Sequence, residues 1–432
     1  MMQQWFKDAK FGISLHWGIY AVNGIPESWS FFNGSISYED YMKQCDGFTA
    51  SRYDPEAWAD LFARAGAQYA VLTTKHHDGV ALWDTAVSDL SVVKKTPAAR
   101  DLVQPYCDAM RKKGLKVGFY FSHLDWSHPD YPTMYSPLHL QKMALGTFVH
   151  SPYVHPADGK LRPERWESFL AFHRAQLTEL MTRYGTIDMF CFDGDWERSS
   201  EQWRMAELRD LLHELNPNVV LNSRMCGLGD FETPEQGIPI APPKGEWEFW
   251  FTVNDSWGYQ PQDQNYKSVR QIIRMFADCI GMGGNVLLNV APLEDGTIDP
   301  VQEDRLLQLG EWLEPNGEAV YGTMAGLPAG HYNGASTLSK DRTVLYLFYY
   351  DKPLEALPVK GLFNAVKSVN ILKSGKELGF RKIGGAPWLN VPGILWIDLP
   401  EEYADERATV IRVELEGELK LYTGSGKAID VN

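Results

Sequence analysis

Short apolar runs alternate with longer amphipathic stretches through the first three quarters of the chain. Runs of about four to eight apolar residues bounded by turn residues are typical of buried parallel strands. The expected strands are Phe11–Leu15, Tyr69–Lys75, Lys116–Ser122, Ile187–Asp193, Val219–Arg224, Trp247–Phe251 and Asn285–Val290. Because helical patterns separate these strands, the sequence predicts an α/β fold, a (β/α)8-like TIM-type barrel, in preference to a doubly wound sheet.

The amphipathic stretches predict the helices of this barrel. Asp54 is a suitable N-cap, and Pro55 fits the first turn of the helix that follows. The expected helices are Asp54–Ala67, Leu102–Lys113, Arg165–Tyr184, Trp203–Leu215, Val269–Cys279 and Val301–Glu314. Residues 127–161 show little periodicity and many Pro, His and Tyr residues, which predicts a long surface insertion at the rim of a site.

The pattern changes after about residue 323, where strands follow one another without helical periodicity. The expected strands are Thr343–Tyr350, Ser368–Leu372, Ile394–Leu399 and Thr409–Leu415, separated by Gly, Pro, Asn and Asp turns. This pattern is typical of an all-β sandwich. We therefore predict a catalytic barrel over residues 1–323 and a C-terminal β-sandwich domain over residues 324–432.

Charge and composition exclude several classes of partner. The net charge of −15 argues against nucleic acid and anionic membranes as partners. No apolar stretch is long enough for a transmembrane helix, and residues 1–11 lack a signal-peptide core, so a cytoplasmic location is expected for the chain as given. No glycine-rich nucleotide motif follows a strand, so no cofactor is expected. The five widely spaced cysteines predict reduced thiols, and a homo-oligomer stays open.

Polar residues stand at the ends of successive predicted strands. They are His16, His76, His77, Tyr120, Asp193 and Arg224, with Glu235 and Glu248 following. A barrel brings the carboxyl ends of its strands to one face. Because burying such groups without partners costs a few kcal/mol each, their recurrence predicts a functional site at this face. The chain also has 15 Trp residues, whose faces suit sugar rings.

Two chemistries use such a set of residues. Metal-assisted hydrolysis would take His16, His76 and His77 as ligands, but adjacent histidines in strand geometry point to opposite faces. Glycoside hydrolysis instead needs two carboxyl groups, roughly 5–5.5 Å apart in a retaining enzyme. We favour the second chemistry and keep the first as an alternative.

Asp193 is the expected nucleophile in this interpretation, although an Asp at this place is also a common cap of the following turn. A nucleophile must be ionised, and a nearby Arg224 would lower its pKa. Glu235 stands beside Pro234, and partly apolar surroundings raise the pKa of an acid/base carboxyl. Asp195, beyond the glycine, is expected to be a loop carboxylate.

Eight motifs in matching order over roughly residues 5–323 resemble those of the α-L-fucosidases of glycoside hydrolase family 29. They are FGISLHWG, TTKHHDGV, GFYFSHLDW, FDGDW, NSR followed by GDFETPE, SWGY, GGNVLLNVAPLEDG and NGEAVYGT. The resemblance implies a retaining exo-acting enzyme that removes terminal α-L-fucose from glycans or fucosides. It implies a covalent fucosyl-enzyme intermediate and no metal.

By these motifs Asp193 corresponds to the nucleophile and Glu235, in some members, to the acid/base, with Glu248 as its rival. The motifs imply a substrate pocket formed by His16, Glu27, Trp29, His76, His77, Tyr120, Arg224 and Trp257. Many members have adjacent Glu and Trp in the loop after the first strand, whereas Ser28 here separates Glu27 from Trp29. Glu27 is therefore either shifted or has lost its contact.

Two alternatives to a fucosidase follow from the same residues. One is a catalytically inactive fucose-binding protein on the same scaffold, against which the retention of Asp193 and Glu235 argues. The other is the metal-dependent barrel hydrolase. The expected partner is a fucosylated oligosaccharide or glycoconjugate.

Overall fold

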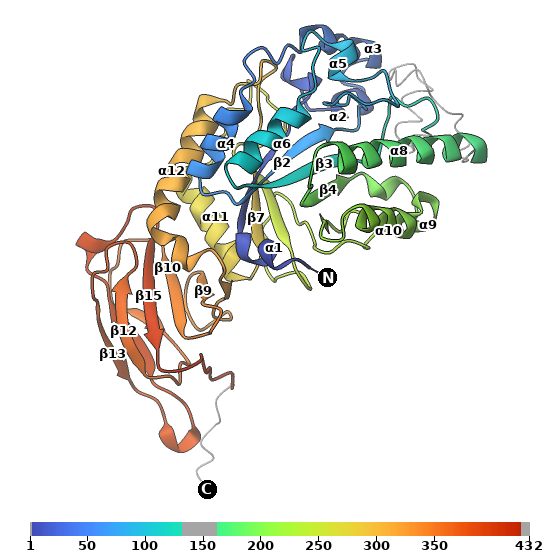
Figure 1. Cartoon of the computed structure of the whole chain (residues 1–432). Helices are drawn as coiled ribbons and strands as arrows, with labels where there is room; N and C mark the ends of the chain where they lie inside the picture. Colours follow the sequence, from blue (N-terminus) through green and yellow to red (C-terminus); the bar gives the residue numbers. More distant parts are fainter. Residues whose placement is uncertain (1, 132–161, 425–432) are drawn as a thin grey trace.

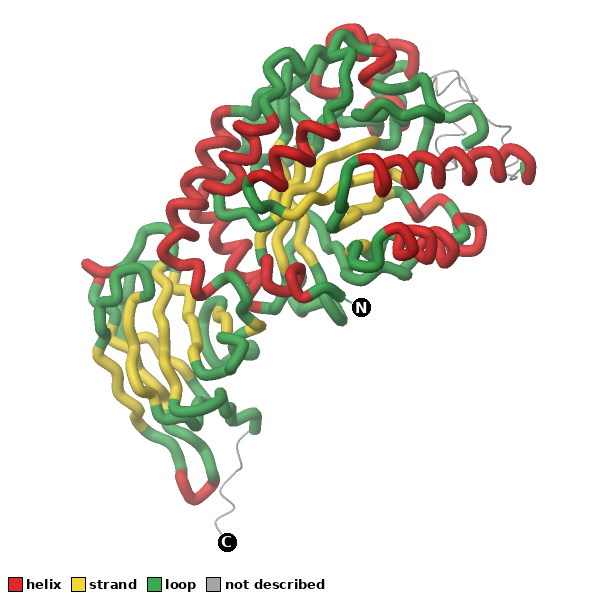
Figure 2. Tube along the Cα trace, in the orientation of Figure 1, coloured by secondary structure: helices red, strands yellow, loops and turns green. Residues whose placement is uncertain are grey.

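The computed structural model describes residues 2–131 and 162–424. A parallel seven-stranded sheet, in the order β5-β4-β3-β2-β1-β7-β6, forms the centre of the larger domain (Figures 1 and 2). Its strands are β1 (Phe11–Leu15), β2 (Tyr69–Lys75), β3 (Lys116–Ser122), β4 (Met189–Asp193), β5 (Val220–Leu221), β6 (Glu248–Thr252) and β7 (Asn285–Val290). All seven expected strands are present, within a few residues of their predicted ends.

An irregular extended segment, residues 230–236, lies between the edge strands β5 and β6. On one side, the amide of Asp230 donates to Leu221 O and the amide of Ser223 donates to Phe231 O. On the other side, isolated parallel bridges join Glu232 to Trp247 and Glu235 to Trp250. The sequence predicted only a loop here. The segment connects the two edges of the sheet, so the expected TIM-like barrel is confirmed with one irregular position.

The helices that cover the sheet lie where the apolar spacing predicts them. Asp54 caps α4 through a hydrogen bond from the amide of Ala57, and Trp58 and Phe62 on this helix are buried. The covering helices are α4 (Pro55–Arg64), α6 (Val103–Lys112), α8 (Pro163–Arg183), α10 (Met205–Leu215), α11 (Val269–Gly281) and α12 (Pro300–Asn316).

Short helices occupy the loops that the sequence left without structure. They are α1 (Gln4–Ala9), α2 (Trp29–Phe32), α3 (Tyr38–Met42), α5 (Val92–Lys95) and α9 (Ser200–Trp203), with 3-10 turns η1 (Ile19–Ala21), η2 (Lys43–Gly47), η3 (Asp195–Glu197) and η4 (Gly317–Ala319). The predicted insertion at 127–161 lies outside the described residues except for 127–131, where Tyr131 is buried and donates to Glu197.

The C-terminal domain contains two antiparallel sheets, ordered β12-β15-β10-β9-β8 and β11-β14-β13. Leu345 and Val413 of one sheet share a buried core with Leu395 and Ile397 of the other, so the two sheets form a sandwich. The strands are β8 (Met324–Ala325), β9 (Ser336–Leu338), β10 (Val344–Tyr349), β11 (Leu357–Val359), β12 (Val366–Ile371), β13 (Gly379–Ile383), β14 (Ile394–Asp398) and β15 (Thr409–Leu415). The predicted boundary at residue 323 stays a prediction.

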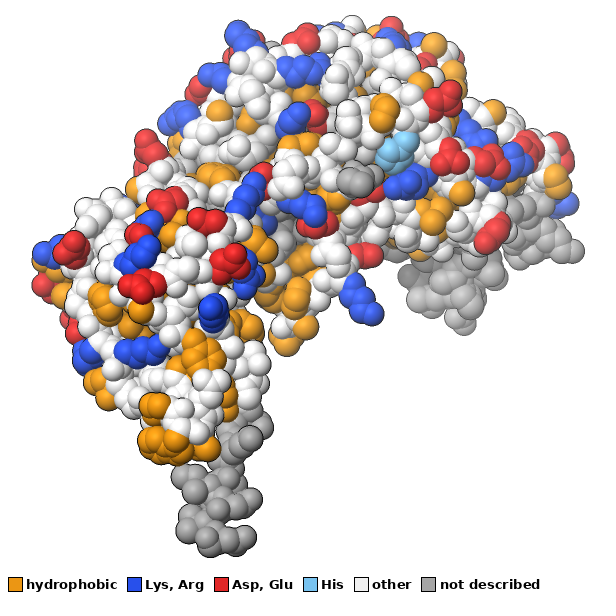
Figure 3. Space-filling model, turned by 60° about the horizontal axis from the view of Figure 1, so that its bottom comes forward, with side chains coloured by type: hydrophobic (Ala, Val, Ile, Leu, Met, Phe, Trp, Pro, Cys, Tyr) orange, Lys and Arg blue, Asp and Glu red, His pale blue; other side chains and the backbone are white. Residues whose placement is uncertain are grey.

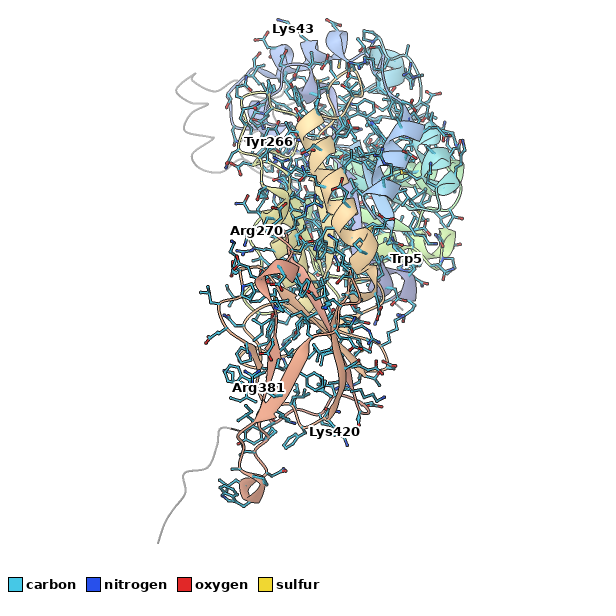
Figure 4. All side chains as sticks on the ribbon, turned by 90° about the vertical axis from the view of Figure 1, so that its left-hand side faces the viewer. Trp5, Lys43, Tyr266, Arg270, Arg381 and Lys420 are labelled. Carbon is cyan, nitrogen blue, oxygen red and sulfur yellow. The ribbon has the colours of Figure 1, made fainter. Side chains whose placement is uncertain are left out.

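The β domain packs against the end of the barrel on the side of α11 and α12 (Figure 1). The indole of Trp312 is buried and donates to the carbonyl of Ala408, and Arg412 pairs with Glu318. Arg270 lies at this junction and pairs with Asp351 (Figure 4). These contacts come from α11, α12 and η4 and not from the carboxyl ends of the strands.

Two features of the surface concern the expected partners. Apolar side chains gather at the outer end of the β domain (Figure 3), where β13 and η5 (Pro387–Leu389) expose Phe380, Ile383 and Trp388. Over residues 2–131 and 162–424, no helix combines the length and apolarity needed to span a membrane. All five cysteines are free thiols, as predicted.

Candidate active site

The polar strand ends surround a cavity of about 310 Å³. It is lined by His16, Glu27, Trp29, His76, Tyr120, Asp193, Trp196, Arg224, Glu235, Trp250 and Trp257. Nine of these residues were predicted from the sequence. His77 lies directly behind this lining, 3.7 Å from Asp193 between Nε2 and Oδ2. Glu248 is absent from the lining.

Asp193 is the last residue of β4 and is held by three donors. The hydroxyl of Tyr120 donates to Oδ2 at 2.6 Å, while Arg224 Nη1 and the amide of Gly194 donate to Oδ1 at 2.5 Å and 3.0 Å. Gly194 adopts a left-handed conformation, with φ at 85°, and so turns the chain directly after the carboxylate. The side chain is therefore fixed in one orientation.

The environment favours the ionised form of Asp193. Burial raises its pKa, but the charge of Arg224, the nearby His77 and the hydroxyl of Tyr120 outweigh burial, so that the pKa is lowered overall. Arg224 stays charged because its two carboxylate neighbours offset the cost of its own burial and raise its pKa.

Burial keeps the site histidines neutral, lowering the pKa of both His16 and His77 to about 4. The hydroxyl of Ser122 donates to Leu124 O at 2.9 Å, so it accepts from His77 Nδ1 at 2.5 Å. Nε2 of His77 is thereby an acceptor, and it is buried without a hydrogen-bond partner among the described residues. It is oriented to accept a hydrogen bond from a hydroxyl placed beside Asp193.

His16 has the same tautomer for the same reason. Its Nδ1 lies 3.0 Å from the amide oxygen of Asn289, which only accepts, so Nε2 of His16 is also an acceptor. His76 and His77 both face the site, contrary to the expectation that they point apart. The strand geometry ends at Lys75, after a register irregularity between Thr73 and Lys75 against β3.

The inserted Ser28 does not displace Glu27. Glu27 and Trp29 both line the cavity, and Ser28 turns inward, with Oγ 2.6 Å from Nδ1 of His76. Glu27 accepts a hydrogen bond from the amide of Gly258, and a Cβ at position 258 would lie 2.9 Å from Glu27 Oε1. Burial raises the pKa of Glu27 to about 7. Glu27 therefore lines the cavity despite the inserted Ser28, and its contact with a sugar stays a prediction.

Two tryptophans of the lining were missed by the sequence reasoning. Trp196 follows Asp193 by three residues and is 53% exposed, stacked at 6.2 Å between ring centroids with Trp29. Trp250 lies on β6 within a run of aromatic residues, where no alternation indicates which side chain points inward. For Trp196 the signal was present, because an aromatic residue ends the FDGDW motif.

The two rival acid/base residues lie in different places. Glu235 lines the cavity with a side chain that is 43% exposed, and its Oε2 accepts from Arg224 Nη2 at 2.6 Å. Glu248 is fully buried inside the barrel, where it accepts from Tyr69 and Trp250. Arg224 thus connects Asp193 to Glu235, while Glu248 does not face the cavity.

Asp195 is placed as expected for a loop carboxylate, since its Oδ2 accepts from the amide of Cys226 at 2.6 Å. Within the described ranges, no group of three or more His, Cys, Asp and Glu side chains is arranged to hold a metal ion.

The α-L-fucosidase family model matches residues 1–318 of the chain. This chain belongs to the α-L-fucosidase family. Among relatives of this family, the tissue α-L-fucosidase of Macaca fascicularis is 32% identical over 93% of this chain and 85% of its own length. α-L-Fucosidase isoenzyme 1 of Paenibacillus thiaminolyticus has a similar structure, with 35% identity, a TM-score of 0.85 and coverage of 96% of this chain and 98% of its own.

A third similar structure is an α-L-fucosidase of glycoside hydrolase family 29 from Bacteroides thetaiotaomicron, with 26% identity and a TM-score of 0.82 over 96% of each chain. It is a covalent intermediate formed with 2-fluoro-fucosyl fluoride and trapped in a glutamate-to-glutamine variant. The predicted family, the glycoside hydrolase class and the α-L-fucosidase activity are confirmed. The individual roles of the site residues stay predictions.

Proposed function

We propose that this α-L-fucosidase releases terminal α-L-fucose by a retaining mechanism, with Asp193 as the nucleophile and Glu235 as the acid/base. The bridge formed by Arg224 is the observation that carries the proposal, because one guanidinium binds both carboxylates at 2.5 Å and 2.6 Å. The bridge places both carboxylates at the same cavity, where the nucleophile and the acid/base of a retaining enzyme must meet one sugar.

In the first step Asp193 attacks the anomeric carbon, the bond to the leaving oxygen breaks, and Glu235 gives that oxygen its proton. The products are a fucosyl ester of Asp193 and the free alcohol. In the second step Glu235 takes a proton from water, the water oxygen attacks the same carbon, and the ester bond breaks to return the carboxylate. Two inversions at one carbon give net retention.

The environment of each carboxyl group fits its part in these steps. The lowered pKa of Asp193 keeps it ionised before attack and makes it a good leaving group in the second step. In the second step Glu235 is a carboxylate, and its oxygen can accept from Arg224 as it does in this structure. In the first step we expect protonated Glu235 to leave Arg224 and turn toward the leaving oxygen, for which its exposed side chain has room.

The cavity supports a single terminal sugar as the group that is bound. Its volume of about 310 Å³ is at the small end of ligand pockets, as expected for one monosaccharide. Neutral His16 and His77 offer acceptors to sugar hydroxyls, and Trp29 and Trp257 offer apolar faces to the methyl group and ring. We propose a fucosylated oligosaccharide or glycoconjugate as the natural substrate.

Hydrolysis of an aryl α-L-fucoside, followed by NMR, tests this proposal. We expect turnover that is insensitive to a chelator, with the α-anomer of L-fucose appearing before mutarotation. First appearance of the β-anomer would contradict the retaining mechanism. Absence of turnover would favour a fucose-binding protein, and loss of turnover with chelator would favour the metal-dependent alternative.

Replacing Arg224 with methionine is expected to move the acid limb of the kcat/KM profile to higher pH by about one unit. Arg224 lowers the pKa of Asp193, so without this charge the carboxylate becomes protonated, and inactive, at a higher pH than in the wild type. Arg224→Lys keeps a positive charge and should shift the limb less. An unchanged limb in Arg224→Met would show that another group sets the acid side of the profile.

A further inference from the structure

Glu248 is a carboxyl group buried inside the barrel, and none of the described cations pairs with it. Its side chain is on β6, none of it is exposed, and its hydrogen-bond donors are the hydroxyl of Tyr69 and the indole of Trp250, the latter at 2.5 Å. Burial raises its pKa to about 7. Burial raises the pKa of the thiols of Cys191 and Cys279, and the charge of Glu248 raises each of them further. Because burying a carboxyl group costs free energy, we looked for a neighbouring side chain that Glu248 holds in place.

Trp250 connects this buried carboxyl group to the cavity. Residues two apart on a strand point to the same face, so Glu248 and Trp250 both project inward from β6. The indole N–H of Trp250 donates to Glu248, and the same side chain lines the cavity. The guanidinium carbon of Arg224 lies 5.2 Å from the centroid of this ring, a cation–π contact.

The backbone of Trp250 holds the acid/base segment as well. Its amide donates to Pro234 O at 2.9 Å, and its carbonyl accepts from the amide of Gln236 at 2.8 Å. These two bonds lie on either side of Glu235. Trp250 therefore contacts Arg224 through its ring and fixes Glu235 through its backbone.

We propose that Glu248 is a positioning residue, which fixes the ring of Trp250 so that the ring supports Arg224 in its bridge between Asp193 and Glu235. The inference rests on the proposed function of these two carboxylates. It gives Glu248 a role other than acid/base catalysis. Without the hydrogen bond from Trp250 to Glu248, the indole is free to change orientation, and Arg224 loses the surface on which it lies.

Three variants test this role: Glu248→Gln, Glu248→Leu and Trp250→Phe. In Glu248→Gln the amide oxygen still accepts from Trp250 and the amide nitrogen can donate to Tyr69, so kcat/KM should stay within about threefold of wild type. Glu248→Leu should lower kcat/KM about 10- to 100-fold, because small displacements of catalytic groups are costly. Its acid limb should rise by about one pH unit, as in Arg224→Met, because Arg224 no longer holds Asp193.

Trp250→Phe keeps an aromatic face but loses the N–H donor, so we expect a change in the same direction as in Glu248→Leu. In the double variant, Glu248→Leu should add little to Trp250→Phe, since both remove one interaction. Leu287→Val is a matched control, because Leu287 belongs to the same buried cluster and makes no hydrogen bond through its side chain. It should lower the denaturation midpoint and leave the acid limb in place.

An acid limb at its wild-type position in Glu248→Leu, or additive effects in the double variant, would overturn the inference and leave the proposed function standing. In a further variant, Glu248→Ala, rescue by azide would identify Glu248 as the acid/base and so overturn the roles proposed for Glu235 and Glu248. If circular dichroism shows that Glu248→Leu does not fold, Trp250→Phe decides by the position of its acid limb. A wild type without fucosidase turnover would overturn the inference together with the proposed function.

Discussion

Asp193→Ala is expected to lower kcat on an aryl α-L-fucoside by about 10⁴-fold or more, because the covalent step then has no nucleophile. The remaining site should still bind fucose, since His16, Trp29 and Glu27 line the cavity independently of this side chain. The Kd of L-fucose, measured by isothermal titration calorimetry, should therefore change far less than kcat.

Azide gives this prediction a stereochemical test. In Asp193→Ala the vacated space beside Tyr120 and Arg224 can admit azide, which attacks from the face that Asp193 occupied and gives β-fucosyl azide. Asp195→Asn is the matched control on the same loop, because Asp195 accepts from the amide of Cys226 and does not line the cavity. Near-normal turnover in Asp193→Ala, or an equal loss in Asp195→Asn, would refute the nucleophile assignment.

Glu235→Ala is expected to lower kcat on a fucosylated oligosaccharide by about 10²- to 10⁴-fold, the usual contribution of general acid–base catalysis. An aryl fucoside with an acidic phenol should be affected differently. Its leaving group needs no proton, so the first step continues, the fucosyl ester on Asp193 accumulates, and KM falls together with kcat. Mass spectrometry of the quenched enzyme should then show the added fucosyl group.

Azide should rescue Glu235→Ala by attacking that ester from the opposite face and giving α-fucosyl azide. The contrast with the β-azide from Asp193→Ala separates the two roles in one pair of measurements. Glu232→Ala removes an exposed carboxylate three residues earlier on the same segment and should behave as the wild type does. If oligosaccharide and aryl fucoside lose activity equally in Glu235→Ala, Glu235 is not the proton donor.

The barrel strands and most of the site follow from the sequence because their signals are local. Each of β1 to β4 is an apolar run that ends in a polar residue or is followed directly by one, and parallel strands place those residues at one edge. The segment that carries Glu235 has no such run. Its backbone pairs with β5 and β6, but its side chains include a proline and several charged residues, which do not indicate a strand. The pairing is therefore visible only in the folded barrel.

Other predictions were wrong because they relied on a local sequence pattern that the tertiary structure overrides. The opposite orientation expected for His76 and His77 assumed strand geometry beyond Lys75, where the strand has already ended. Trp250 was missed because it stands between two other aromatic residues, Phe249 and Phe251, and such a run gives no alternation from which to choose an inner face. In the β domain, β13 was missed because all five of its residues are exposed, so no apolar face marks it.

The irregular position of the barrel has a consequence for how this enzyme can change. Residues 230–236 are hydrogen-bonded through their backbone to both edges of the sheet, and they carry the carboxyl group that must meet the leaving group. An insertion or deletion within them would move Glu235, whereas residues 237–246, which follow, are exposed or half-buried. Libraries that seek new aglycone preferences should therefore vary the length of residues 237–246 first and leave intact both segments that carry the catalytic carboxylates.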